Sequence, residues 1–227
     1  MRRVTINLTD LKKLSILNGV DDHQVQSLLS SFTLREATQG EVVYSKTDEE
    51  NKISFVFSGK VKLVEVNDRG IEVTKDIVGE DEIFGFNASV SNASFEYAEV
   101  VTRNARLIHI SQNDFNEVMK RIPTLSRNYA FNLNAKIRKL EERYINLAMN
   151  DPKSRLLYIL SEMATRGGKK ENGMLKVENY LTQDELARMI FVSRQTLSRI
   201  FRELRNSGAL RYKRHQIEIS ETSLCNY

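Results

Sequence analysis

Apolar residues recur at alternating spacings of three and four between positions 130 and 147, in a segment whose other positions are mostly polar or charged. This heptad spacing lines up apolar side chains as a narrow stripe on one side of an α-helix. An identical stripe on a second copy of the chain buries such a surface well. We therefore predict a dimerisation helix whose contacts include Leu133, Ile137, Leu140, Tyr144 and Leu147. The alternative is a helix that packs on the core of its own domain.

The segment Asn150-Asp151-Pro152 is predicted to end this helix, because proline lacks the amide hydrogen and restricts the residue before it. We place the dimerisation helix and hinge at residues 121–150. One domain is then expected over residues 1–120 and another over residues 151–227.

The composition places limits on the kind of protein. No apolar run approaches the roughly 18 to 20 residues of a membrane span, and the N-terminus lacks the apolar segment of a signal peptide. We therefore expect a cytoplasmic protein with no membrane contact. The one cysteine, Cys225, excludes an intrachain disulfide, a cysteine-type zinc site and a cysteine-held iron–sulfur cluster within one subunit.

Short β-type runs separated by glycines occupy the chain from residue 34 to residue 110. Several runs alternate apolar and polar residues, as half-buried strands do. The glycines suit tight turns that need a positive φ angle. The pattern predicts an all-β sandwich, barrel or roll. Its runs are 42–44, 53–57, 61–66, 71–73 and 107–110, and its glycines are Gly40, Gly59, Gly70, Gly79 and Gly85.

Positive charge is concentrated in the last third of the chain. Residues 152–227 hold 14 Lys and Arg against 8 Asp and Glu, whereas residues 1–151 hold 20 against 22. A basic domain attracts a polyanion, because it neutralises phosphates and releases their counterions. The excess alone is weak support for nucleic-acid binding, since many solvated surfaces are basic.

Two helix starts follow each other closely within this basic part. Thr182 stands three residues before Glu185, which is the spacing of a capping box, and Ser193 can cap a second helix. Two helices joined by so short a turn cross steeply, and the second presents polar side chains near its N-terminal end. A recognition helix presents that end to base edges in the major groove. We therefore predict that the bases are read by Arg194, Gln195, Ser198 and Arg199.

A β-hairpin with a basic tip is predicted after Gly208, and it would form the wing of a winged helix-turn-helix. The paired donors of arginine match O6 and N7 of guanine, and the amide of Gln195 matches adenine. Residues 151–227 are therefore predicted to bind double-stranded DNA. Contacts to its phosphates are expected from Thr182, Ser193, Thr196, Arg202, Lys213 and Arg214.

The run Ser193-Arg194-Gln195-Thr196-Leu197-Ser198-Arg199 resembles the recognition-helix signature of the bacterial family of the cyclic-AMP receptor protein and the fumarate–nitrate reduction regulator, the Crp/Fnr family. The order of the predicted elements also resembles that of the family over nearly the whole chain. The resemblance implies an α+β fold: an N-terminal β-roll, which is a double-stranded β-helix like the cyclic-nucleotide-binding domains, then the dimerisation helix and the winged helix-turn-helix. It also implies a homodimer that binds a pseudo-palindromic operator and contacts RNA polymerase. One departure is Phe191, which stands where many such turns have glycine.

A second departure concerns the effector. In the family's cyclic-nucleotide binders a glutamate holds the ribose hydroxyl and an arginine pairs with the cyclic phosphate. Here Phe86 replaces the acid, Glu96 replaces the arginine, and Leu140-Glu141 replaces the Thr-Ser pair that reaches the adenine. A carboxylate repels the phosphate, so we do not expect cyclic AMP to bind. The residues expected to line an effector pocket are Phe86, Asn87, Glu96, Tyr97 and Leu140.

The sequence leaves the cofactor unknown. A small apolar or acidic metabolite, a haem and the absence of any small molecule all stay open, and His23, His109 and His215 are the histidines that a haem could use. No metal site is predicted. We expect a sequence-specific DNA-binding transcription regulator, controlled by a signal in the β-roll, and no enzyme.

Two other classes of function are alternatives. One is a cyclic-nucleotide-like binding module or regulatory subunit that acts through protein contacts. The other is a cupin-type enzyme, which the sequence disfavours because the histidine and glutamate cluster of such enzymes is missing.

Overall fold

The computed structural model describes residues 3–4, 6–48, 51–85, 94–165, 167–213 and 215–224. Phe86, Asn87, Arg214 and Cys225 therefore lie outside the described residues. The chain forms two compact units, residues 1–137 and 138–227. Helix α4, Pro123–Met149, contributes to both. The division by function into 1–120, 121–150 and 151–227 stays a prediction.

Two antiparallel sheets form the framework of the first unit. The five-stranded sheet has the order β1 (Arg3–Val4), β2 (Phe32–Thr38), β9 (Asn104–Ser111), β4 (Lys52–Ser58) and β7 (Ile83–Phe84). The four-stranded sheet has the order β3 (Val42–Ser45), β8 (Ser94–Val100), β5 (Val61–Asn67) and β6 (Glu72–Val78). Four of the five predicted runs lie within β3, β4, β5 and β9, and the fifth overlaps β6. The β-roll prediction is confirmed.

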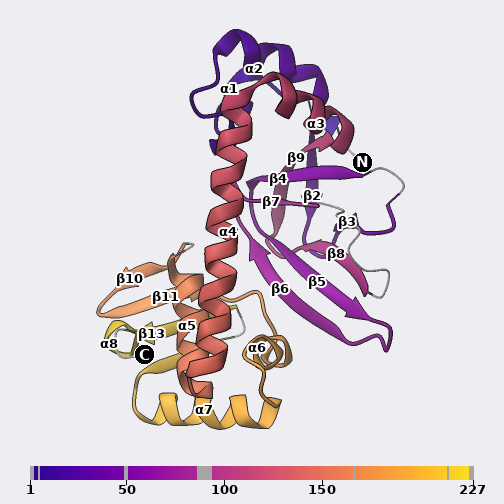
Figure 1. Ribbon diagram of the computed structural model, residues 1–227. Coiled ribbons are helices and arrows are strands. Elements are labelled where there is room, and N and C mark those ends of the chain that lie inside the picture. The colour runs from indigo at the N-terminus through magenta and orange to yellow at the C-terminus, as the bar shows by residue number, and fades with distance from the viewer. Residues whose placement is uncertain are drawn as a thin grey trace. The chain divides into compact units, whose positions relative to one another are not determined.

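Successive side chains of β9 alternate between two apolar cores, because neighbouring residues of a strand point to opposite faces. Ala105 and Leu107 belong to a core with residues of both sheets, whereas Ile108 and Ile110 belong to a core with the helices. Figure 1 shows these helices gathered at the start of α4. They are α1 (Leu8–Leu11), α2 (Asp22–Leu28) and α3 (Gln112–Arg121), with the 3-10 turns η1 (Ser15–Leu17) and η2 (Leu29–Ser31).

Four of the five glycines predicted to adopt positive φ do so, with φ between +73° and +90°. Two of them are also held by close packing. A Cβ on Gly59 would lie 2.7 Å from the carbonyl oxygen of Asn104, and one on Gly85 would lie 2.6 Å from that of Lys52. The prediction for Gly79 is wrong, because its φ is outside the left-handed region. Its amide instead donates to the Glu82 carboxylate at 2.7 Å, which any residue other than proline could do.

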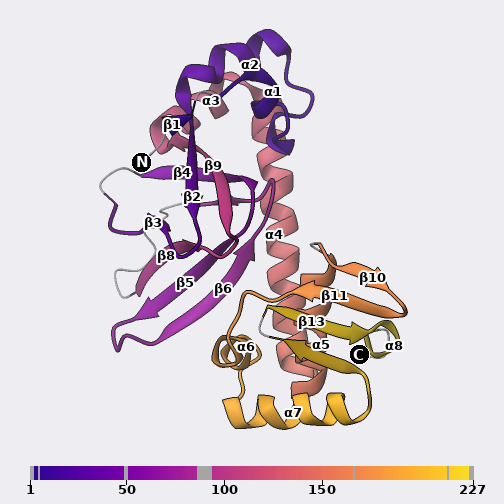
Figure 2. The same cartoon turned by 180° about the vertical axis from the view of Figure 1, so that it is seen from behind.

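The second unit combines helices with a small antiparallel sheet (Figure 2). The sheet has the order β10 (Lys169–Glu171), β11 (Met174–Glu178), β13 (Gln216–Ser220) and β12 (Leu210–Lys213). The helices are α5 (Pro152–Thr165), α6 (Gln183–Met189), α7 (Arg194–Asn206) and α8 (Glu221–Leu224). The residues of β10 are exposed and pair with β11.

The predicted end of the long helix is confirmed. Helix α4 ends at Met149, and α5 begins at Pro152, where a proline lacks only an amide hydrogen that the helix does not use. Asp151 accepts the backbone amides of Lys153 at 2.8 Å and Ser154 at 3.0 Å, so it caps α5. The segment between the two helices is therefore short and well bonded.

One buried histidine lies in the five-stranded sheet. His109 on β9 is paired through its Nδ1 atom with the Ser54 hydroxyl at 2.8 Å, and no described group reaches its Nε2 atom. Burial lowers the pKa of His109 to about 4, and the charges of Arg35 and Lys52 act in the same direction. His109 is therefore neutral at physiological pH.

The buried histidine makes stability depend on pH. Between pH 6.5 and about 4 the unfolded chain holds a proton on His109 that the folded chain does not. We predict that the free energy of unfolding falls by up to about 3 kcal/mol as the pH is lowered through this range. Below pH 4 the contribution of His109 is fully lost. Denaturant unfolding followed by circular dichroism at several pH values measures this change.

A His109→Gln variant is the control, because its amide can bond Ser54 but does not titrate. Its free energy of unfolding should change less between pH 6.5 and 4 than that of the parent protein. Equal changes in the two proteins would show that other groups cause the dependence.

Candidate nucleic-acid interface

Helix α6 begins with the capping box that the sequence predicts. The Thr182 hydroxyl accepts the amide of Glu185 at 3.2 Å, and the Glu185 carboxylate accepts the amide of Thr182 at 2.7 Å. These two bonds satisfy amides that a helix start leaves without intrahelical partners. The start of α6 is therefore fixed by local sequence.

One side of α7 is buried in the second unit. Its buried residues are Leu197, Ile200, Phe201 and Leu204, and those of α6 are Leu186 and Ala187. The ring of Phe201 lies 5.2 Å from the ring of Tyr212 on β12. In Figure 2, α6 is seen end-on and α7 from the side, so the two helices cross steeply, as predicted.

The four predicted base-reading residues lie on the opposite side of α7. Arg194, Gln195 and Arg199 are exposed, and Ser198 is half-buried. At 100° per residue they fall on one continuous face, which also carries the exposed Arg202. The structure therefore brings these side chains together, while their contact with bases stays a prediction.

The N-terminus of α7 is capped by Ser193. Its hydroxyl accepts the amide of Thr196 at 3.1 Å, and the two hydroxyls lie 3.0 Å apart. A helix N-terminus favours anions, because its amides and its dipole carry partial positive charge. Three of the predicted phosphate contacts lie at such helix starts, where a phosphate is favoured: Thr182, Ser193 and Thr196.

The turn between α6 and α7 is strained at Phe191. Its φ is +57°, a left-handed conformation that is energetically unfavourable for any residue with a Cβ atom. The side chain of Phe191 is 68% exposed. The departure from glycine that the sequence shows is therefore accommodated by strain. The turn is held by the carbonyl of Ile190, which accepts from Arg155 of α5 at 3.4 Å.

The wing consists of β12 and β13, which pair from Leu210 to Lys213. Lys213 is exposed and lies 3.8 Å from the carboxylate of Glu218, whose side chain is mostly buried. Arg211 lies 3.7 Å from the same carboxylate. Glu218 therefore holds two basic side chains of the wing.

The apolar stripe of α4 is largely exposed in the single chain. Tyr144 is 71% exposed and Leu140 is 56% exposed, and Leu133 and Ile137 are also exposed, whereas Leu147 is half-buried. Three further large apolar residues of α4 are exposed, Phe131, Ile145 and Met149. Exposed apolar surface of this extent along one helix is typical of a protein interface.

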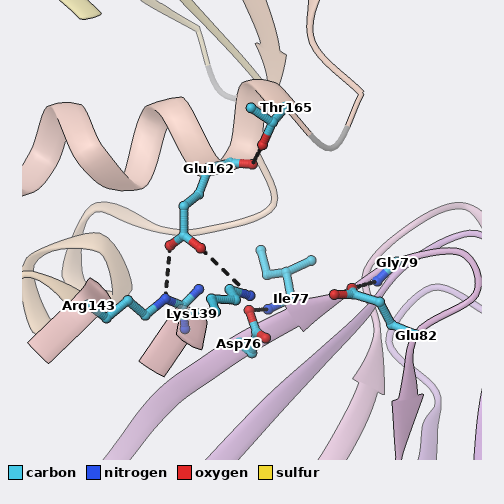
Figure 3. Close-up of polar contacts among 8 residues, drawn as sticks. All are labelled: Asp76, Ile77, Gly79, Glu82, Lys139, Arg143, Glu162 and Thr165. Carbon is cyan, nitrogen blue, oxygen red and sulfur yellow. Dashed lines mark hydrogen bonds and ion pairs between the residues drawn. The ribbon is translucent and has the colours of Figure 1, made fainter. Parts of the chain in front are cut away.

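An ion-pair cluster joins the second half of α4 to α5 (Figure 3). The Glu162 carboxylate accepts from the Nε atom of Arg143 at 2.8 Å and lies 3.8 Å from the Nζ atom of Lys139. All three side chains are less than one-fifth exposed. This partly buried contact packs the second half of α4 on α5 within the second unit.

The predicted effector residues do not share one face. Glu96 points with Ala98 to the interior between the sheets, where its carboxylate binds Lys75, and Lys75 also binds Glu65 at 2.9 Å. Tyr97 lies on the other face of β8 and donates to Glu72 at 3.2 Å. Leu140 is exposed on α4. Phe86 and Asn87 lie outside the described residues.

Lys75 and its carboxylates extend toward Tyr44 on β3. Burial, followed by the negative charge of Glu96, raises the pKa of Tyr44 to about 12. Burial by itself lowers the pKa of Lys75, but hydrogen bonds to Glu96 and Glu65 raise it overall. The four-stranded sheet therefore carries a partly exposed group of charges that are paired within the chain.

The histidines considered for haem are separated. His23 on α2 and His215 in the wing turn are exposed, and His109 is buried. Among the described residues, no cluster of three or more His, Cys, Asp or Glu could hold a metal ion, and no helix is long and apolar enough to span a membrane.

Sequence reasoning missed two carboxylates beside the predicted DNA contacts. Asp184 on α6 lies 3.5 Å from Arg194, and Glu218 on β13 of the wing lies 3.8 Å from Lys213. Alternation along residues 216–219 could have placed Glu218 on the polar face of its strand. The pairing of Asp184 and Arg194 depends on how α6 and α7 cross, so local pattern could not reveal it.

Two family descriptions match the chain in the order in which its parts occur. Residues 34–122 match the cyclic nucleotide-binding domain, and residues 154–223 match the Crp-like helix-turn-helix domain. The first falls in the unit with the β-roll and the second in the unit with α6, α7 and the wing.

Characterised relatives extend over most of the chain. The cyclic AMP receptor protein of Thermus thermophilus is 24% identical over 214 residues, which cover 94% of this chain and 96% of the relative. A global nitrogen regulator of Synechocystis is 22% identical over 183 residues, which cover 80% and 81% of the two chains. The first is named as a receptor for cyclic AMP and the second as a regulator of nitrogen.

Solved structures share the fold. A CooA variant from Carboxydothermus hydrogenoformans has a TM-score of 0.70 at 21% identity and covers 99% of this chain and 96% of its own. A transcriptional regulator of the CRP/FNR family from Thermus thermophilus has a TM-score of 0.67 at 24% identity and covers 85% and 96%.

The strained turn provides a test of the local structure. Replacing Phe191 by Gly should raise the free energy of unfolding by about 1 kcal/mol, because glycine adopts positive φ without the Cβ penalty and little buried surface is lost. Thermal and denaturant unfolding measure the effect. Phe191→Ala is the control, since it removes the ring but keeps the Cβ atom. A glycine variant no more stable than the alanine variant would contradict strain at this turn.

Proposed function

The chain belongs to the Crp/Fnr family of DNA-binding transcription regulators, and we propose that it acts as a homodimer on a pseudo-palindromic operator, under a signal other than cyclic AMP. The operator is read in the cytoplasm, where bacterial DNA lies, and RNA polymerase is the partner through which transcription changes. The observation that carries this proposal is the exposed polar face of α7, opposite its buried side, in a chain with an exposed apolar stripe on α4.

Homodimerisation follows from the apolar stripe. Leu133, Ile137, Leu140 and Tyr144 repeat at heptad spacing and are exposed in the single chain. A second α4 brings the same side chains at the same spacing, so the two stripes can interdigitate along their length. Two copies of α7 are then related by a two-fold axis, and two major grooves about 34 Å apart can receive them.

The half-site follows from the exposed face of α7. Arg194 and Arg199 are suited to guanine O6 and N7, and Gln195 is suited to adenine N6 and N7. Ser198 can bond to several base edges. The phosphate contacts come from Thr182, Ser193, Thr196, Arg202, Lys213 and Arg214, and they position the helix without selecting a sequence.

The paired charges around Lys75 of the β-roll disfavour a cyclic phosphate. Glu96 is bonded to Lys75, and Glu65 shares the same lysine. A phosphate beside Glu96 would meet two carboxylates and one already paired cation, and repulsion grows as water leaves the site. This is the basis for a signal that differs from the one named in the cyclic AMP receptor relatives.

The signal reaches DNA through α4. A change in the β-roll alters how the two α4 helices pack, and Glu162 passes the change to α5 through Arg143 and Lys139. The spacing of the two recognition helices then fits successive major grooves in one state and not in the other.

Selection of operator sites from randomised duplexes tests the assignment of Gln195. The parent protein should select one preferred half-site twice, in inverted orientation. Gln195→Glu should shift the preference at one position of each half-site toward C·G, because a carboxylate accepts from cytosine N4. A selected site unchanged by this substitution would refute the role of Gln195, and selection of no sequence at all would refute the proposed function.

Lys213→Ala is the matched control for that experiment. It removes a wing cation rather than a base-reading group, so binding to all sequences should weaken by a similar factor. The salt dependence should also become shallower by about one phosphate contact.

Dimerisation is tested at the centre of the stripe. Ile137→Glu places facing carboxylates in the apolar seam and should raise the dimer dissociation constant about hundredfold or more. Glu142→Lys, on the opposite side of α4, should change it little. Native mass spectrometry and sedimentation across a concentration series measure both. A dimer of unchanged stability in Ile137→Glu would exclude the stripe as the interface.

A further inference from the structure

The two first turns of α6 and α7 are joined by an ion pair on the exposed side of the second unit. Arg194 is the first residue of α7, and its Nη1 atom lies 3.5 Å from Oδ2 of Asp184 in the first turn of α6. The side chains are 66% and 51% exposed. In water such a pair contributes little to stability, so a structural reason for it is weak.

Asp184 is not needed to cap its own helix. Thr182 and Glu185 bond reciprocally at the start of α6, and Glu185 supplies a negative charge to the helix dipole. A second carboxylate beside a predicted DNA contact is unfavourable by itself, because it repels phosphates. We therefore look for the role of Asp184 in its contact with Arg194.

We propose that Asp184 is a positioning residue that orients the Arg194 guanidinium for guanine and so determines specificity at one base of each half-site; this rests on the proposed function. Arginine has five N–H donors, and a guanine uses two of them through O6 and N7. The remaining donors can bind Asp184 at the same time. The carboxylate thereby restricts a long flexible side chain to the orientation in which both guanine bonds form together.

Binding to DNA strengthens this pair. When the duplex covers the first turns of α6 and α7, water leaves and the attraction between carboxylate and guanidinium increases. Without the guanine contact, Asp184 only weakens binding through repulsion of phosphates. The same residue therefore improves binding to the correct sequence and reduces binding to all others.

The test is Asp184→Asn in the full-length protein, with affinities measured by fluorescence anisotropy on the selected operator, on its single-base variants and on a random duplex. The base read by Arg194 is first identified as the position at which Arg194→Ala loses preference. Asp184→Asn should reduce discrimination at that position by about fivefold or more, and it should tighten binding to the random duplex.

Glu203→Gln is the matched control. Glu203 lies on α7, as Arg194 does, and its carboxylate is 3.8 Å from Arg199. The substitution therefore removes one negative charge near the predicted DNA contacts without removing a partner of Arg194. It should tighten binding to the random duplex but keep the preference at the Arg194 position. Circular dichroism melting establishes that both variants stay folded.

A double variant separates positioning from a direct effect of Asp184. In the Arg194→Ala background, Asp184→Asn should cause no further loss of discrimination at this base. Full discrimination in Asp184→Asn, or a further loss in the double variant, would overturn the inference. Failure of the parent protein to select any sequence would overturn the proposed function instead, so the two failures are distinct.

Discussion

Burial of one side of α7 determines what the second unit presents to a duplex. Leu197, Ile200, Phe201 and Leu204 are buried, and each contributes roughly 1.5–3 kcal/mol through removal of apolar surface from water. A helix held in this way cannot rotate about its axis without exposing them. The polar face between Arg194 and Arg202 is therefore fixed outward by residues that never touch DNA, and its side chains can vary without loss of the fold.

Helix α4 combines two kinds of surface along its length. Its stripe exposes apolar side chains such as Ile137 and Tyr144, whereas Lys139 and Arg143 are covered by their contact with Glu162 of α5. Partly buried charges restrict the geometry of a contact more than apolar groups do, because an unpaired charge is costly. The arrangement suits a helix whose exposed stripe joins a second subunit while its charged side packs on α5.

Features that depend on neighbours in sequence could be predicted, and features that depend on the assembled fold could not. The caps at Thr182 and Ser193 and the end of α4 before Pro152 follow from residues at most four positions apart. Strand β8 was missed as a strand because Glu96 interrupts its apolar face, and that charge is tolerated only because Lys75 of another strand pairs with it. The four-residue helix α1 is too short to show a period. The contact of Asp184 with Arg194 exists only after α6 and α7 cross.

Carboxylates accompany the cations of the DNA-facing surface. Asp184 lies beside Arg194, Glu203 beside Arg199, and Glu218 beside Arg211 and Lys213. On contact with DNA, each of these four cations must therefore exchange or share a carboxylate that it already has, so the unit gains less from a random phosphate backbone than its formal charge of +6 over residues 152–227 implies. A correct base sequence offers the same cations fixed acceptors at the right distance. Internal pairing thus lowers non-specific affinity more than specific affinity, and sequence discrimination arises from the charges of the fold as well as from its base contacts.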